Sequence, residues 1–261
     1  MTDLFREIRI NRLKLEKRKP WPSGAEEQLY DWQKEKIVYY SMHLDGLLLT
    51  TETIRSLEMG ELVKEASFAD YNLVQGLVEA LNYITSVRKS VLGSAERIPR
   101  LPEMCRMWGM LNGKNEEETL EIWRSRSFLR KENPVLRAME FVPCHFQDVE
   151  RELNQFFLWL SKEAGNMEAS PIDFAVEAHN RWISVYPFTS HNEALARLLF
   201  EAILFANGLP MVPFPMTESE YYSSILDGSL NDKMEIVVDK TLKMALQLTD
   251  SRELHQRSGG C

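Results

Sequence analysis

A short polar loop that leads into an apolar helix is the part of this sequence best placed for chemistry. Residues 186–192 read YPFTSHN, and an apolar stretch predicted to be helical follows over residues 193–207. The first N–H groups of a helix have no intrahelical partners, and its N-terminus carries partial positive charge. The order of segments therefore predicts an anion site, although an ordinary turn between two helices has the same spacing.

His191 is the loop residue best suited to proton transfer. Its imidazole has a reference pKa near neutrality, so it could act as an acid or base; the alternative, which the pattern favours, is an exposed loop histidine without a role. His179 lacks the strict spacing of a zinc site, and we interpret it as a core residue bonded to backbone. The sequence contains no recognisable Ser-His-Asp or Cys-His nucleophile set, and no metal site is predicted.

The segments that position this loop are predicted to be helices, because apolar residues recur at three-to-four spacing. A capping box of Ser23 and Glu26 opens a helix that runs to about residue 43. Thr50 or Thr51 caps the next one, and a longer helix starts near residue 67. Further helices are predicted over residues 146–162 and after Ser170, which caps a helix whose first position is proline.

One β-hairpin is expected in this mainly α chain. Residues 127–129 and 135–142 flank Glu132-Asn133-Pro134, a sequence typical of a turn between two strands. A hairpin in an α protein often serves as a flap. The predicted fold is therefore a helical bundle with one small β-hairpin flap.

The overall composition is that of a globular protein: 261 residues, of which 44% are hydrophobic and 27% charged. The net charge of −8 argues against binding to nucleic acid or to anionic membranes. Residues 6–19 are the exception, with seven basic and two acidic side chains, and form either a solvated helix face or a contact for an acidic partner. No stretch resembles a membrane span or a signal peptide, and three cysteines cannot all pair, so we expect a cytoplasmic protein.

Several segments, in the same order, resemble the Fic family (Fic/Doc, or fido fold). Its signature is His-Pro-Phe, two residues, Gly-Asn-Gly-Arg, two residues, Arg; this chain keeps Pro187, Phe188, Asn192 and Arg197. Residues 41–46 (SMHLDG) resemble the inhibitory-helix motif of the family. His179, residues 134–153 and residues 220–222 also match in order, so the similarity covers roughly residues 37–226.

The resemblance implies a Fic-like helical bundle with three parts. Residues 1–90 would be an N-terminal helical region with the inhibitory-type helix, residues 91–250 the Fic-like core, and residues 251–261 a flexible tail. Fic proteins typically transfer AMP from ATP to a hydroxyl of a target protein. The signature histidine acts as base, an acidic residue holds magnesium, and the glycines and asparagine cradle phosphates.

The chain departs from this pattern at the positions that carry the reaction. Tyr186 replaces the histidine, and a phenol with a reference pKa near 10 is a poor proton acceptor. Ser190 replaces the acidic residue, and a neutral hydroxyl is a weak magnesium ligand. His191 and Glu193 replace the glycines, and Ala194 the first arginine. Because Glu193 would repel a triphosphate, we expect no cofactor and no binding of a magnesium-nucleotide.

The remaining signature arginine implies a second role for the loop. In the family it contacts the far phosphate of ATP or pairs with the inhibitory glutamate, whose position here holds Asp45. We therefore predict an Asp45–Arg197 ion pair with a structural or regulatory role, against two separately solvated charges. Glu193 could replace the bound anion at the helix N-terminus.

The resulting site prediction has three parts. Tyr186 and His191 are the candidate catalytic residues, and Asp45 is the candidate regulatory residue. The candidate pocket for an anion or substrate consists of Asn192, Glu193 and Arg197.

These observations leave three functional hypotheses. The first is a degenerate Fic-like protein that lacks the AMP-transfer machinery and acts by binding or regulating a protein, such as a target or a related Fic partner. The alternative is a divergent Fic-fold enzyme acting on a nucleotide, phosphate-bearing or carboxylate substrate. The third is an interaction module that uses the basic N-terminal segment. Partner and substrate stay unidentified, and a homodimer is one option for the assembly.

Overall fold

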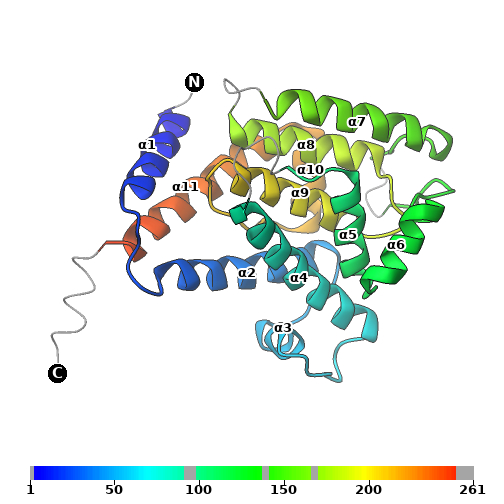
Figure 1. The fold of residues 1–261 in the computed structure, drawn as a ribbon, viewed down its shortest axis with the longest axis horizontal. Helices are drawn as coiled ribbons and strands as arrows, with labels where there is room; N and C mark the ends of the chain where they lie inside the picture. Colours follow the sequence, from blue (N-terminus) through cyan, green and yellow to red (C-terminus); the bar gives the residue numbers. More distant parts are fainter. Residues whose placement is uncertain (1–2, 91–97, 137–140, 166–169, 251–261) are drawn as a thin grey trace.

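The fold consists of helices joined by loops (Figure 1). The computed structural model describes residues 3–90, 98–136, 141–165 and 170–250, so the predicted tail at 251–261 lies outside the described residues. Within these ranges the helices are α1 (Asp3–Lys17), α2 (Ala25–Leu44), α3 (Thr51–Glu58), α4 (Phe68–Ser90), α5 (Leu101–Leu111), α6 (Glu116–Ser125), α7 (Val149–Glu163), α8 (Pro171–Val185), α9 (Asn192–Ala206), α10 (Glu218–Leu226) and α11 (Leu230–Leu248), with a short 3-10 helix at Phe146–Asp148.

The prediction of a mainly α fold is confirmed. The starts of the helices show which of the predicted N-caps are formed. Thr50 caps α3 by accepting a hydrogen bond from the backbone N–H of Thr53 at 3.1 Å. Ser170 caps α8, whose first residue is proline. The capping box predicted at Ser23 is wrong, because Gly24, in a left-handed conformation with φ of 81°, is the N-cap of α2 and makes no side-chain cap bond.

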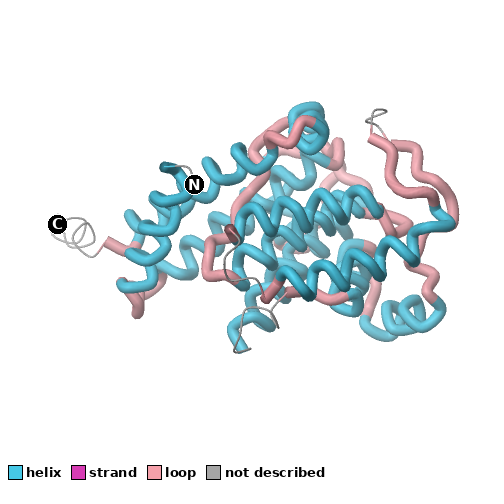
Figure 2. The backbone as a smooth tube through the Cα atoms, turned by 90° about the horizontal axis from the view of Figure 1, so that it is seen from above, coloured by secondary structure: helices cyan, strands magenta, loops and turns pink. Residues whose placement is uncertain are grey.

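The predicted hairpin is not formed in the described part of the chain, where Figure 2 shows helices and loops only. Leu129 instead makes an isolated antiparallel bridge with Phe188. The N–H of Arg130 donates to the carbonyl of Pro187, and the N–H of Thr189 to the carbonyl of Phe128, each at 3.0 Å. Residues 137–140 of the predicted second strand lie outside the described residues. The first predicted strand therefore pairs with the 186–192 loop.

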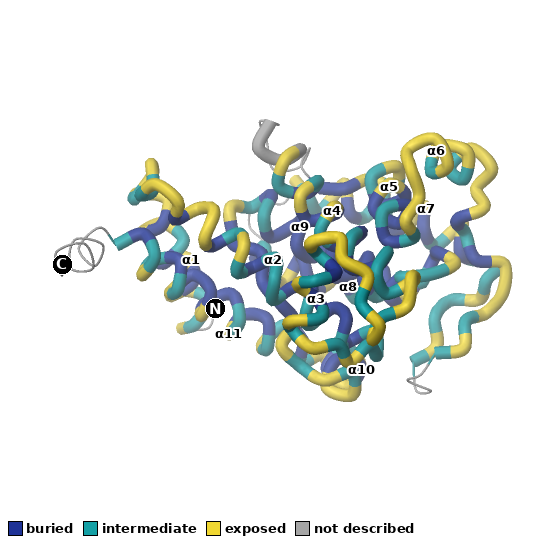
Figure 3. The backbone as a smooth tube through the Cα atoms, turned by 90° about the horizontal axis from the view of Figure 1, so that it is seen from below, coloured by how far each residue is buried: buried dark blue, intermediate teal, exposed yellow. Residues whose placement is uncertain are grey.

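The core is organised around α9, which is buried along most of its length (Figure 3). It packs against α8, α4 and α5, which is the environment expected for a helix that is apolar on several faces. No helix in the described ranges combines the length and apolarity needed to cross a membrane. The loop at the N-terminus of α9 is therefore attached to a helix that is buried along most of its length.

Two of the three charged residues of α9 are buried. Glu201 is 1% exposed, and its Oε2 accepts a hydrogen bond from the backbone N–H of Val212 at 2.9 Å. Burial raises the pKa of Glu201 well above its ordinary value, which favours the neutral carboxyl. Arg197, one turn earlier, is 2% exposed and belongs to the candidate site.

The N-terminal helix α1 packs along α11, and the two extend beyond the rest of the bundle (Figure 1). Two residues of the basic segment are used inside the chain. Arg12 donates to the carbonyl of Asn207 at the C-terminus of α9, and Arg18 donates to the carbonyl of Leu246 near the C-terminus of α11. Cations are favourable at helix C-termini, so part of this segment stabilises the fold.

Candidate functional site

The 186–192 loop has a fixed shape because Asn192 closes it internally. Asn192 is fully buried; its Oδ1 accepts from the N–H of Phe188 at 2.9 Å, and its Nδ2 donates to the carbonyl of the same residue at 2.8 Å. Phe188 packs edge-on against Trp182 and Phe128, with ring centroids 5.2 and 5.0 Å apart. Asn192, predicted to line a pocket, thus uses both polar ends to hold the loop.

Two non-glycine residues of the loop adopt left-handed backbone conformations. Tyr186 has φ of 47° at the end of α8, and His191 has φ of 57° at the N-cap of α9. Such a conformation costs a side-chain-bearing residue roughly 1–2 kcal/mol. His191 occupies a position where the Fic signature has glycine, the residue that adopts such a conformation without strain.

His191 is half-buried between the acidic groups of the site, so the exposed-loop alternative is wrong. Burial lowers the pKa of His191, while the Asp45 and Glu193 carboxylates raise it in part and Arg197 lowers it further. The imidazole is therefore neutral at neutral pH and able to accept a proton.

The carboxylate of Glu193 is held by two phenols at the N-terminus of α9. Its Oε1 accepts hydrogen bonds from Tyr186 OH at 2.7 Å and from Tyr222 OH at 2.9 Å. Burial, followed by the negative charge of Glu193, raises the pKa of both tyrosines above their ordinary value. Both phenols therefore stay protonated donors at neutral pH.

The predicted Asp45–Arg197 ion pair is formed. Arg197 Nη2 lies 2.7 Å from Asp45 Oδ1, and the two side chains are 2% and 17% exposed. Ser41 supplies two more acceptors, its hydroxyl at 3.3 Å from Nε and its carbonyl at 3.4 Å from Nη2. Burial by itself would lower the pKa of Arg197, but Asp45, Tyr221 and Glu193 together outweigh burial and raise the pKa. The buried Nη1 has no partner in the described part of the chain.

A buried histidine–tyrosine pair lies beside this ion pair. The Arg197 guanidinium lies 5.7 Å from the ring centroid of Tyr221, whose hydroxyl donates to His179 Nε2 at 2.7 Å. His179 Nδ1 donates to the side-chain oxygen of Asn180 at 2.9 Å, so its prediction as a core residue is confirmed, but the predicted backbone partner is wrong. Desolvation lowers the pKa of His179 to about 3.

Ser190, at the acidic position of the signature, is bonded within the protein. Its hydroxyl accepts from Trp108 Nε1 and donates to Asn112 Oδ1, both at 3.1 Å. The described ranges contain no group of three or more His, Cys, Asp or Glu side chains arranged for a metal ion.

Arg130 is a site residue that the sequence did not indicate. It is 7% exposed and donates to the carbonyls of Tyr186 at 2.7 Å, Val185 at 3.3 Å and Glu132 at 3.1 Å, and also to that of Cys144. These bonds place a cation at the C-terminus of α8 and tie the start of the loop to residues 130–133 and 144.

Tyr222 and Ser41 were also absent from the predicted site. The only sequence signal for them was their position in segments that resemble Fic proteins. The predicted residues themselves do come together, since Tyr186 bonds Glu193 and Asp45 bonds Arg197. His191 lies close enough to both pairs for the charges of Asp45, Glu193 and Arg197 to shift its pKa.

Comparisons with known proteins agree with this architecture. The family model for the Fic/DOC family matches residues 110–204. Protein adenylyltransferase fic-1 of Caenorhabditis briggsae is 30% identical over 197 residues, which are 75% of this chain and 36% of that protein. Protein adenylyltransferase Fic of Nematostella vectensis is 29% identical over 192 residues, 73% of this chain and 42% of that protein. The chain thus spans less than half the length of these relatives.

Solved structures show the same fold. A Fic domain-containing signaling protein from Bacteroides thetaiotaomicron superposes with a TM-score of 0.77 at 20% identity, covering 93% of this chain and 96% of that one. Fic-1 from Caenorhabditis elegans superposes with a TM-score of 0.69 at 22% identity, covering 94% of this chain and 70% of that one. The sequence match and the shared fold agree with the signature-like loop: residues 110–204 of the chain match the Fic/DOC family, and the chain has the Fic fold.

Proposed function

We propose that this Fic-fold chain does not transfer AMP by the usual mechanism of the Fic family and acts by binding or regulating a protein partner. The observation that carries the proposal is the Glu193 carboxylate, which two tyrosine hydroxyls hold at the N-terminus of α9. A carboxylate is favourable at a helix N-terminus, so Glu193 takes the role of the bound anion and repels a triphosphate.

The protonation chemistry of the loop supports the same conclusion. Tyr186 stands at the position of the family's base, and its raised pKa keeps the phenol protonated. A protonated phenol cannot take a proton from the hydroxyl of a target protein. Ser190 stands at the metal position with its hydroxyl already bonded to Trp108 and Asn112. These residues do not fit a magnesium-bound nucleotide.

Arg197 and the neighbouring surface support binding without catalysis. The guanidinium is engaged by Asp45 and Ser41, the arrangement in which the family closes its far-phosphate pocket. Arg130 bonds the carbonyls of Glu132 and Cys144. Val135 and Val142 lie close to these two residues in sequence, and their side chains are 100% and 83% exposed. They supply apolar surface for a protein partner.

The test is nucleotide binding and transfer by the purified protein. We expect ATP with magnesium to leave the melting temperature unchanged and α-labelled ATP to leave no label on the chain or on added proteins. A ligand at 100 times its Kd would add about 2.7 kcal/mol of stability, so binding of that strength would be visible. An ATP shift that is lost in Arg197→Ala, or label on any protein, would overturn the proposal.

A divergent enzyme is the second candidate, favoured by two observations. His191 is a neutral imidazole within the site, and Arg197 Nη1 is a buried donor without a partner in the described residues. A substrate with a phosphate or carboxylate could use both groups. A thermal-shift and turnover screen of nucleotides, nucleotide-sugars and CDP-choline separates the two candidates. A divergent enzyme requires that one of these ligands raises the melting temperature and that Arg197→Ala abolishes the rise. It also requires turnover of that ligand that His191→Asn abolishes.

A further inference from the structure

The outward side of α1 carries basic and apolar side chains together. Ile10 and Leu13 are 43% and 49% exposed. Arg6, Arg9 and Lys17 are also exposed, and each lies one helical turn from one of these two residues, which places it on the same side. The opposite side contains the buried residues of the helix, Ile8, Asn11 and Leu15. We call the outward set the α1 face: Arg6, Arg9, Ile10, Leu13 and Lys17.

The positive charge of the α1 face is not neutralised within the described ranges. Both acidic residues of the basic segment pair elsewhere, Glu7 with Lys243 on α11 at 2.9 Å and Glu16 with Lys19 at 3.0 Å. The three cations of the α1 face form no ion pair in the described part of the chain. Unpaired cations beside exposed apolar side chains favour binding of a partner that is acidic and partly apolar.

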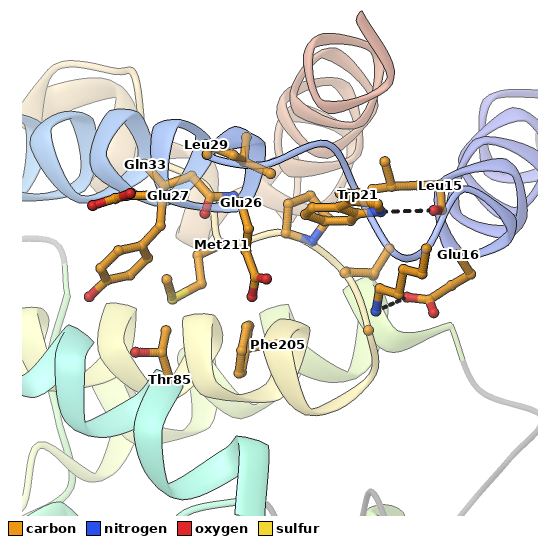
Figure 4. Close-up of a pocket in the computed structure, with 16 residues that line it drawn as sticks. Leu15, Glu16, Trp21, Glu26, Glu27, Leu29, Gln33, Thr85, Phe205 and Met211 are labelled. Atoms are coloured by element: carbon orange, nitrogen blue, oxygen red, sulfur yellow. Dashed lines mark hydrogen bonds and ion pairs between the residues drawn. The ribbon is translucent and has the colours of Figure 1, made fainter. Parts of the chain in front are cut away.

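The helix that carries this face is anchored to the bundle at its C-terminal end. Trp21, in the connection to α2, donates from Nε1 to the carbonyl of Leu15 at 3.2 Å (Figure 4). Arg12 and Arg18 bond carbonyls at the ends of α9 and α11. Because α1 and α11 extend beyond the rest of the bundle, a second protein can approach the α1 face without meeting the core helices (Figure 1).

A second group of exposed apolar side chains lies where α3 is joined to α4. Met59, Leu62 and Phe68 are 71%, 73% and 68% exposed. The ring of Phe68 stacks on that of Tyr71 with centroids 6.0 Å apart, and Gly60 lies beside the Tyr71 hydroxyl. These contacts bring the end of α3 next to the start of α4. Exposed apolar side chains grouped in this way mark a binding surface.

The charge around these apolar side chains is negative. Glu61 and Glu65 are exposed and form no ion pair among the described residues. Asp70 adds a third carboxylate, whereas Lys64 is the one basic residue of the sequence between positions 59 and 71. We call this surface the α3–α4 patch: Met59, Glu61, Leu62, Glu65 and Phe68. It matches the α1 face in both respects, because it offers carboxylates to the cations and apolar surface to the apolar side chains.

We propose that the α1 face of one copy of this chain binds the α3–α4 patch of a second copy. Figure 1 shows α1 and α3 well apart, so one copy does not cover its own patch. The two surfaces differ, so the contact is heterologous: made reciprocally by two copies it gives a symmetric dimer, and made in succession it gives a ring or a chain. This assembly is independent of whether the 186–192 loop catalyses a reaction.

Sedimentation velocity of the purified chain tests the proposal. A contact made by one helix face is small, so we expect weak association, visible at about 0.1–0.5 mM protein and low salt. Raising the salt from about 0.05 M to about 0.5 M should weaken the association about tenfold, because salt screens exposed charges. A protein that stays monomeric over this concentration range at low salt would overturn the proposal.

Charge reversal on either surface should abolish the association. Arg6→Glu/Arg9→Glu changes only the α1 face, and Glu61→Lys/Glu65→Lys changes only the α3–α4 patch. Each variant by itself should be monomeric at low salt, because like charges then face each other across the contact. The substituted side chains are exposed, so the melting temperature of each variant should equal that of the wild type.

Mixing the two variants shows whether the two surfaces bind each other. An equimolar mixture should associate again, because the intact α1 face of one variant meets the intact patch of the other. Glu117→Lys/Glu121→Lys on α6 is the matched control: it changes the net charge as much as the patch variant does, outside both surfaces, and should associate like the wild type. Association that survives in either surface variant, a mixture that stays monomeric, or loss of association in the α6 control would each refute the proposal.

Discussion

Replacing Asp45 with alanine is expected to lower the free energy of unfolding by about 3–5 kcal/mol, the cost of leaving a buried charge without its partner. Arg197 is the more deeply buried member of the pair and loses its only ionic partner among the described residues. The Ser41 hydroxyl and carbonyl still accept hydrogen bonds but carry no net charge. The variant should therefore unfold at a clearly lower urea concentration.

A surface ion pair provides the matched control for this variant. Asp31 lies 3.4 Å from Lys34 and its side chain is 60% exposed, so Asp31→Ala should cost no more than about 1 kcal/mol. A double-mutant cycle that combines Asp45→Ala with Arg197→Met then isolates the interaction energy. If Asp45→Ala costs no more than Asp31→Ala, the charges of Asp45 and Arg197 are solvated separately and do not form a buried ion pair.

Acid is expected to destabilise the protein through His179. Its pKa is lowered by burial to about 3 in the folded chain, against about 6.5 when unfolded, so between these values only the unfolded state binds the proton. The neutral imidazole makes its full contribution to the free energy of unfolding above pH 6.5, and this contribution falls as the pH drops. At pH 4.5 the loss should reach about 2–3 kcal/mol.

Urea unfolding of the wild type and of His179→Gln over pH 4.5–7.5 measures this loss. Glutamine can still accept from Tyr221 but does not titrate in this range. The free energy of unfolding of the wild type should fall relative to that of the variant by about 2–3 kcal/mol across the range. A pH-independent difference would mean that His179 takes up a proton while folded, beside the positive charge of Arg197.

The helices could be predicted because their signals are local. The caps at Thr50 and Ser170 and the apolar spacing of α9 depend on neighbours within one or two turns. The hairpin prediction is wrong because the pairing of residues 127–129 depends on residues distant in sequence. Phe128 is buried by stacking on Trp123 and packing against Phe188, which draws Leu129 to the 186–192 loop.

Some residues of the candidate site could likewise be predicted from the sequence, and others could not. Asp45 and Arg197 were paired because both fall on positions of known motifs, although 152 residues separate them. Tyr222 could not be assigned to Glu193, because residue type alone does not say which of several tyrosines reaches a carboxylate. Arg130 could not be found at all, since most of its acceptors are backbone carbonyls, which every residue has.

The bonds of Arg130 have a consequence for local opening. One guanidinium joins the end of α8, the first residue of the loop, and the carbonyls of Glu132 and Cys144, so these segments are expected to open to solvent as one cooperative unit. Deuterium uptake at the amides of Tyr186 and Cys144 should then occur at similar rates, and both should accelerate in Arg130→Met. A protein that binds over Val142 would slow exchange in the loop without touching it.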